Sequence, residues 1–210
     1  MHMCWLIPQR RSHGTACSSH GKYLIVPDKG FSRAKIIAAL QALGDELTKR
    51  GVHGQVFIVG GAAMALAFSS RRVTKDIDAV FEPKSVVYRA AVKVADDLDL
   101  PDDWLNDAVK GFMPGDDPDR VPLPDVHGIE VTTASPAYLL AMKLMAMRFG
   151  EDEEDIEFLL EECGITNATE ALALLARLYP HQEPPLKTRL FLEELLGPIP
   201  QAKETSRKAE

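Results

Sequence analysis

The chain has 210 residues, of which 46% are hydrophobic and 26% are charged, and its formal net charge is -7. This length suits one compact domain, or a domain with a small helical addition, and the apolar content is sufficient for a buried core. The negative charge excludes a protein that coats nucleic acid through bulk positive charge, whereas an enzyme with a local basic patch remains compatible with it.

Cysteine usage and hydropathy indicate the cellular compartment of the protein. The sequence contains 3 cysteines without metal-ligand spacing, and an odd number is typical of reduced cytosolic thiols. No apolar run approaches the roughly 20 residues that cross a bilayer, and the first residues lack the order of a signal peptide. We therefore expect a cytoplasmic protein with no membrane partner.

The first half of the chain predicts alternating helices and strands. Residues 1–30 have no apolar periodicity and are expected to be a flexible leader. Beyond them, Ser32 can cap a helix that Gly51 can end. The pattern then predicts a buried strand that runs into a glycine turn, a short helix, a second strand and another helix; the ranges are 56–61, 62–68, 76–81 and 86–98.

The second half predicts mainly helices. Residues 100–125 are rich in Pro, Asp and Gly and are expected to form a long loop around one short element. A third strand is expected at 127–134, and Ser135-Pro136 then opens a helix. Further helices are expected at 152–163, 169–178 and 185–196, before a polar tail at 201–210. This order predicts an α/β core over 31–134 and a helical C-terminal region over 135–200.

Two acids and two glycines carry the chemical information. Asp76 and Asp78 are separated by one residue on a predicted strand, so their side chains point to the same face. Like charges held so close repel one another unless a cation lies between them, and Mg²⁺ binds one or two carboxylates together with phosphates and water. Gly60-Gly61, at the entry to a helix, allows close backbone approach and supplies N–H groups that favour phosphate.

Each feature alone has an ordinary structural explanation. A single Asp-x-Asp is more often a solvated strand face, and a Gly-Gly pair is a weak signal. The order of strand, Gly-Gly, short helix and Asp-x-Asp within a second strand is more informative, because an apolar strand has little reason to carry two acids without a partner. The combination predicts a place where a metal ion and a triphosphate meet.

The segment IVGGAAMALAFSSRRVTKDIDAVF resembles the signature of the polymerase-beta-like nucleotidyltransferase superfamily, whose core is a small mixed β-sheet. The later SPAYLLAMKLMAMR, followed by EDEEDIEFLL, resembles the subgroup that contains the AbiEii and MenT toxins. Together the similar segments lie within residues 55–160, about half the chain. The resemblance implies transfer of a nucleoside monophosphate from an NTP, with Mg²⁺ or Mn²⁺ held by the Asp76–Asp78 pair.

The subgroup resemblance also implies roles for further residues. A functional hydroxyl two residues before the first aspartate corresponds to Thr74, and a functional helix lysine corresponds to Lys143. An aspartate beyond the lysine corresponds to Asp152 or Asp155, because Asp-Glu-Glu-Asp offers both choices. In this assignment Lys143 reaches the triphosphate as a point charge, and the aspartate orients that lysine, assists the metal or acts as a base.

Three more residues are candidates near this site. Arg71 and Arg72 precede the aspartate pair and could contact phosphates, although solvation explains loop arginines equally well. Many nucleotidyltransferases have a third carboxylate on a later strand, and Glu130 is the candidate here, although the usual residue is Asp. That difference leaves open whether one metal ion or two would bind.

The resemblance implies a toxin of a toxin–antitoxin pair that modifies the 3′ end of transfer RNA or another RNA, and a cognate antitoxin as partner. Two alternatives remain open at this point. One is a non-catalytic regulatory protein of the same fold that binds nucleotide or a partner. The other is a nucleotidyltransferase that acts on a small molecule or a protein. The sequence contains no Gly-x4-Gly-Lys-Ser/Thr pattern, which argues against a P-loop ATPase.

Overall fold

The computed structural model describes residues 30–68, 73–123 and 126–199. Most of the predicted leader and the whole polar tail lie outside these ranges. The elements in chain order are α1 (Arg33–Lys49), β1 (Gly54–Ile58), α2 (Gly60–Ala67), β2 (Ile77–Glu82), α3 (Lys84–Leu98), β3 (Leu105–Asn106), the 3-10 helix η1 (Ala108–Phe112), β4 (Val121–Pro122), β5 (Ile129–Thr133), α4 (Pro136–Ala146), α5 (Glu153–Glu162), α6 (Ala168–Leu178) and α7 (Leu186–Leu196).

The strands of the described residues form one mixed sheet in the order β3-β2-β1-β5-β4. The central strand β1 runs antiparallel to β2 and parallel to β5. In this register Ile58, the last residue of β1, pairs with Ala79 near the start of β2 and with Thr133 at the end of β5. The C-terminal end of β1 and the N-terminal end of β2 therefore lie next to one another at the same end of the sheet, as the predicted site requires.

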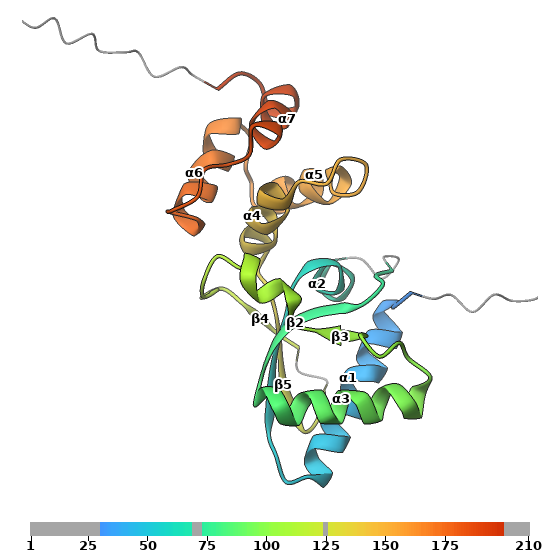
Figure 1. Ribbon diagram of the computed structural model, residues 1–210. Helices are drawn as coiled ribbons and strands as arrows, with labels where there is room; N and C mark the ends of the chain where they lie inside the picture. Colours follow the sequence, from blue (N-terminus) through green and yellow to red (C-terminus); the bar gives the residue numbers. More distant parts are fainter. Residues whose placement is uncertain (1–29, 69–72, 124–125, 200–210) are drawn as a thin grey trace, which may run out of the picture.

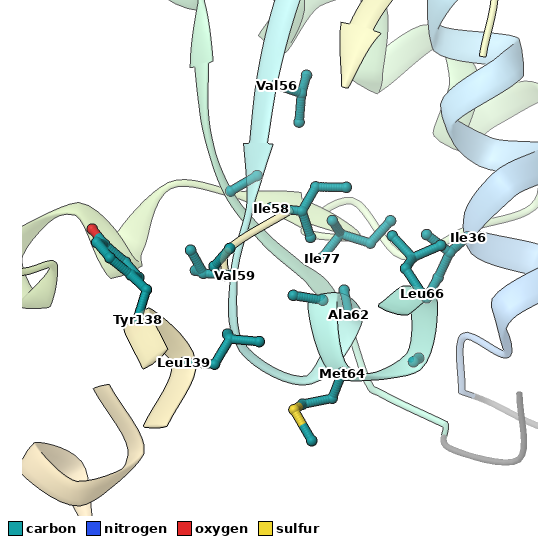
Figure 2. Close-up of a cluster of buried hydrophobic side chains, with 14 of the residues drawn as sticks. Ile36, Val56, Ile58, Val59, Ala62, Met64, Leu66, Ile77, Tyr138 and Leu139 are labelled. Carbon is teal, nitrogen blue, oxygen red and sulfur yellow. The ribbon is translucent and has the colours of Figure 1, made fainter. Parts of the chain in front are cut away.

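One face of the sheet is buried beneath α1 and α3, which lie side by side (Figure 1). Along β1, Val56 and Ile58 point into this core, whereas Gln55 is exposed and Phe57 is half-buried on the other face. Apolar side chains of α2 and α4 extend the core around the end of β1; Figure 2 shows Ile58, Val59, Ala62, Met64, Ile77 and Leu139 there. The opposite face, which carries Asp78, is left partly open.

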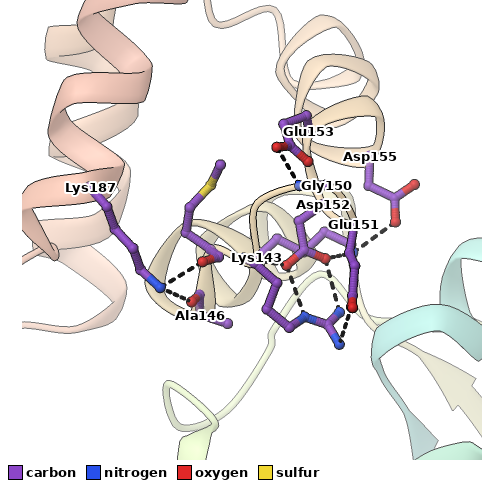
Figure 3. Close-up of polar contacts among 10 residues, drawn as sticks. Lys143, Ala146, Gly150, Glu151, Asp152, Glu153, Asp155 and Lys187 are labelled. Atoms are coloured by element: carbon purple, nitrogen blue, oxygen red, sulfur yellow. Dashed lines mark hydrogen bonds and ion pairs between the residues drawn. The ribbon is translucent and has the colours of Figure 1, made fainter.

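The helices after β5 form the second part of the molecule, next to α2 (Figure 1). Ser135 caps α4 by accepting a hydrogen bond from the Tyr138 backbone N–H at 3.3 Å. On α7, Thr188 donates to the Leu144 carbonyl at 2.7 Å, and the Lys187 ammonium donates to carbonyls at the C-terminal end of α4 (Figure 3). Capping of this kind suits the negative end of the helix dipole and ties α7 to α4.

The fold class is confirmed: the described residues contain a small mixed sheet with interleaved helices, followed by helices. The predicted caps of α1 are also present, because the Ser32 side chain accepts from the Lys35 N–H at 3.4 Å and Gly51 has a φ of +67°. The prediction of a long loop around one short element at 100–125 was wrong. That segment contains β3, η1 and β4, and its Trp104 is completely buried with its indole N–H donated to the Ala91 carbonyl at 3.0 Å.

Within the described ranges, no helix combines the length and the apolar character that crossing a membrane requires.

Candidate active site

The backbone brings the two glycines next to the second aspartate. The ladder between β1 and β2 continues for one residue beyond β1, since the Val59 N–H donates to the Asp78 carbonyl at 2.9 Å. Gly60 follows immediately and begins α2 with a φ of +61°. This conformation is costly for residues with a Cβ atom, so it favours glycine. Gly60 therefore forms the predicted glycine turn, and α2 begins at this residue.

Both glycines also lie where a side chain would have little space. A Cβ atom at Gly60 would lie 3.2 Å from the Asp78 Oδ2 atom, and one at Gly61 would lie 2.7 Å from the Thr74 Oγ1 atom. The first turn of α2 therefore lies directly against both side chains. Because the first N–H groups of a helix have no acceptor within that helix and carry partial positive charge, this turn favours an anion.

We expect Gly60→Ala to lower the free energy of unfolding by about 1–2 kcal/mol, because alanine is strained at this φ. The methyl group would also press against the Asp78 carboxylate. Urea unfolding followed by circular dichroism measures the effect. Gly111→Ala is the matched control, because a Cβ atom there meets nothing within 4 Å. Equal stability of both variants would contradict the tight contact.

The two aspartates share an asparagine from β3. Asn106 pairs in register with Asp78, and its Nδ2 atom donates to the Asp76 Oδ2 atom at 3.0 Å. Burial and then the charge of Asp76 raise the pKa of Asp78, while the Asn106 amide and the positive charge of Arg148 act in the opposite direction. The carboxylates are therefore close enough to repel one another.

Thr74 is held in place through its backbone. It forms a bridge with Phe31, with hydrogen bonds of 2.6 Å from the Phe31 N–H to the Thr74 carbonyl and 3.1 Å in the other direction. Phe31 is completely buried, so it anchors this segment to the core. The hydroxyl of Thr74 consequently lies against Gly61, at the start of α2 and two residues before Asp76.

A cluster of charged side chains lies where α4 leads into α5 (Figure 3). The Lys143 ammonium lies 2.7 Å from the Asp152 Oδ1 atom and also 2.7 Å from the Asp155 Oδ2 atom. Arg148 also binds Asp152, through its Nη2 atom at 2.9 Å and its Nε atom at 3.1 Å. Both of the aspartates between which the sequence could not choose therefore contact the lysine.

Asp152 is a fixed anion in this cluster. It is 1% exposed, and this burial alone would raise its pKa, but hydrogen bonds from Arg148 and Lys143 lower the pKa to about 2. Such an acid is a weak proton acceptor at neutral pH. The arrangement favours orientation of the two cations over a role as general base.

Lys143 and Arg148 differ in how well they can reach a ligand. Lys143 is 8% exposed and its ammonium is held by two buried carboxylates. The side chain of Arg148 is 63% exposed, and its charge acts on Asp78. The guanidinium is therefore the more accessible cation of this cluster.

A cleft of about 560 Å³ brings these parts together. Gly60, Gly61 and Asp78 lie on its wall, and Lys143, Arg148 and Asp152 lie there as well. Thr74 and Asp76 support this wall through Gly61 and Asn106. The structure thus unites the glycine pair, the aspartate pair and the α4–α5 charges, which are far apart in the sequence.

Glu130 is not part of this arrangement. It pairs in register with Gln55, accepts a hydrogen bond from the Gln55 amide at 2.8 Å, and Gln55 in turn pairs with Glu82. Glu82 is four residues from Asp78 along β2, which corresponds to about 13 Å at the rise of an antiparallel strand. Glu130 therefore cannot be a ligand of an ion bound by Asp78, and its assignment as a third metal ligand is corrected.

Of the other predicted residues, Arg71 and Arg72 lie outside the described residues. Among those that are described, no group of three or more His, Cys, Asp or Glu side chains is placed to hold a metal ion.

Neither Asn106 nor a role for Arg148 was predicted from the sequence. Asn106 has no local signal, because its position opposite Asp78 follows from the pairing of β3 with β2. A signal did exist for Arg148, which ends the segment SPAYLLAMKLMAMR.

A known protein family matches most of the chain. Residues 35–179 match a family model described as "Nucleotidyltransferase of unknown function (DUF6036)". No curated protein matches the chain significantly. No solved structure matches it significantly either. The matched range extends from α1 to α6 and includes the glycine pair, the aspartate pair and the α4–α5 cluster.

Proposed function

The chain belongs to the DUF6036 family of nucleotidyltransferases of unknown function, and from this premise we propose that its cleft transfers a nucleoside monophosphate from an NTP to an acceptor hydroxyl. One observation carries the proposal. The N-terminal turn of α2, with Gly60-Gly61, lies against Asp78, and both line one cleft together with Arg148. Helix N–H groups, a guanidinium and a carboxylate pair together match a metal-bound triphosphate.

The residues of the aspartate pair fit a divalent cation. Burial and the neighbouring Asp76 raise the pKa of Asp78, and a cation bound between the two acids would offset both effects. Two carboxylates, with phosphates and water, are a common donor set for Mg²⁺, and Mn²⁺ accepts the same ligands. Glu130 lies elsewhere and would not contribute a ligand to this ion. When bound, the ion would neutralise negative charge on the phosphates.

The remaining side chains would position the substrate. Arg148 would bind phosphate oxygens, and Asp152 would hold its guanidinium in the orientation seen in the cleft. The acceptor oxygen would form a bond to the α-phosphorus, the bond to the β-phosphate bridging oxygen would break, and pyrophosphate would leave. The hydroxyl proton would pass to water. Positioning and charge neutralisation supply most of the acceleration in such transfers.

We propose RNA, and in particular the 3′ end of transfer RNA, as the acceptor, and a toxin role with a cognate antitoxin. The support is the resemblance of the helical segment around Lys143 and Asp152 to the AbiEii and MenT toxins. Because the net charge of the chain is -7, binding of RNA would depend on local cations such as Arg148 and not on the overall charge.

The deciding experiment supplies the protein with Mg²⁺ or Mn²⁺, total RNA and each NTP, labelled in parallel on the α- or the γ-phosphate. We expect the α-label to appear on RNA of transfer-RNA size and the γ-label in pyrophosphate. Incorporation of γ-label into RNA would indicate phosphoryl transfer and contradict the proposal. Labelling of a protein or of a small molecule would show that the acceptor is not RNA. NTP binding without turnover would favour a regulatory protein.

A further inference from the structure

The wall of the cleft carries two chemically different sets of residues. The polar set consists of the glycine pair, Asp78, Lys143, Arg148 and Asp152. The proposed function places the triphosphate at the glycine pair and Arg148. The rest of the wall is mainly apolar and comes from η1, α4 and the end of α6; its side chains are Val109, Phe112, Met142, Met145 and Tyr179. An NTP has the same division, because its flat, weakly polar base is attached to a charged triphosphate.

Phe112 is the unusual member of the apolar wall. Its side chain is 75% exposed, although full burial of a phenylalanine contributes about 1.5–3 kcal/mol in a folded protein. Exposed apolar side chains that line a concave site often mark the place where a ligand binds. A planar ring on the wall of a nucleotide-sized cleft offers a stacking surface.

The backbone beneath this ring is held at both ends. At its C-terminal end, the Phe112 carbonyl accepts a hydrogen bond from the Tyr179 hydroxyl at 2.8 Å. At its N-terminal end, the Ala108 N–H donates to the Asn106 Oδ1 atom at 3.3 Å, and the same asparagine donates to Asp76. The segment that carries the ring is therefore connected to the proposed metal pair through Asn106.

Tyr179 holds the backbone of η1 through its hydroxyl group. It is 5% exposed, and burial raises its pKa to about 12, so its hydroxyl remains a donor to η1 at neutral pH. Gln182 also lies on the cleft wall, three residues after Tyr179, and its polar side chain is a candidate to contact the base. A side-chain amide both donates and accepts hydrogen bonds, so it can pair with the edge of any base.

We infer that the apolar part of the cleft wall binds the nucleobase of the NTP, stacked on Phe112 and contacted at its edge by Gln182. This inference rests on the proposed function, since it assumes a triphosphate at Gly60-Gly61. Stacking tolerates all bases, and one amide hydrogen bond discriminates by about tenfold or less. The site therefore accepts all four NTPs, and the larger purine rings bind more tightly than pyrimidines.

The test is equilibrium binding by calorimetry with Mg²⁺, without acceptor, using ATP, GTP, CTP, UTP and inorganic tripolyphosphate. Phe112→Ala should weaken ATP binding by roughly tenfold or more and leave tripolyphosphate binding unchanged. Phe112→Tyr should retain ATP binding, because it keeps the ring. Leu186→Ala is the control, since Leu186 is 72% exposed and does not line the cleft.

The outcomes separate this inference from the function on which it rests. Tripolyphosphate binding with ATP affinity that is no tighter, or an equal loss of both ligands in Phe112→Ala, would overturn the base site and leave the phosphate site standing. A preference of more than a hundredfold for one NTP would also contradict stacking as the main contact. If the wild-type protein binds neither ligand, both the base site and the proposed function are wrong.

Discussion

Asp78→Asn should reduce nucleotidyl transfer by about a thousandfold or more, equivalent to about 4 kcal/mol of transition-state stabilisation. Asparagine keeps the size of the side chain next to Gly60 but removes the charge that would hold the cation. We expect the same loss for Asp76→Asn, because both carboxylates belong to one donor set. The measurement is the rate of α-label incorporation at saturating NTP and Mg²⁺.

The same substitution should not unfold the protein. Burial and the charge of Asp76 raise the pKa of Asp78, so the charged form is disfavoured in the folded state. This penalty is present at neutral pH and is relieved as the pH falls through the raised folded-state pKa. Without metal, Asp78→Asn should therefore unfold at the same urea concentration as wild type or at a higher one. Mg²⁺ with ATP should stabilise only the wild type, because ligand binding favours the folded state.

Asp96→Asn is the control for the loss of one negative charge. Asp96 is exposed on α3, which covers the other face of the sheet. Its variant should transfer nucleotide at the wild-type rate. Undiminished transfer by Asp78→Asn would eliminate the proposed metal pair, whatever the result for the control.

Asp152→Asn should lower the free energy of unfolding by about 3–5 kcal/mol at neutral pH, because it leaves a buried ion cluster without its central anion. Asp152 is 1% exposed and binds both Lys143 and Arg148. Removing its charge leaves Asp155 as the carboxylate paired with Lys143, and leaves Arg148 with its exposed partner Glu151. Urea unfolding at several pH values measures the cost.

The pH dependence provides a second readout. The pKa of Asp152 is lowered to about 2 from its ordinary value of 3.8. The stability that its charge contributes is complete above the ordinary value and is lost as the pH falls towards the lowered one. The difference between wild type and Asp152→Asn should therefore shrink as the pH approaches about 2.

Glu151→Gln is a matched control for this cluster. Glu151 also pairs with Arg148, at 3.2 Å, but its side chain is 64% exposed. Exposed pairs typically contribute less than about 1 kcal/mol. If Asp152→Asn costs no more than Glu151→Gln, the buried cluster does not stabilise the fold in the way described here.

Several elements could be predicted from local patterns because local physics produces them. The cap at Ser32, the Ser135-Pro136 start of α4 and the alternation around Asp76 and Asp78 depend on neighbouring residues. The segment 100–125 could not be predicted in this way. Its two-residue strand β3 exists because Leu105 and Asn106 pair with β2, and a Pro- and Asp-rich segment has no periodicity that would reveal such a partner.

The chemistry available to this protein is visible in its local sequence patterns: a glycine pair before a helix, two acids with strand spacing, and a lysine with aspartates further along. Which of these side chains meet depends on strand pairing and helix packing. The register across β5, β1 and β2 removes Glu130 from the metal pair, although its residue type suited the role. Packing of α5 on α4 places Lys143 between two carboxylates and leaves Arg148 as the more exposed cation at the cleft. Distances between residues far apart in the chain follow from strand pairing and helix packing, and no local pattern encodes them.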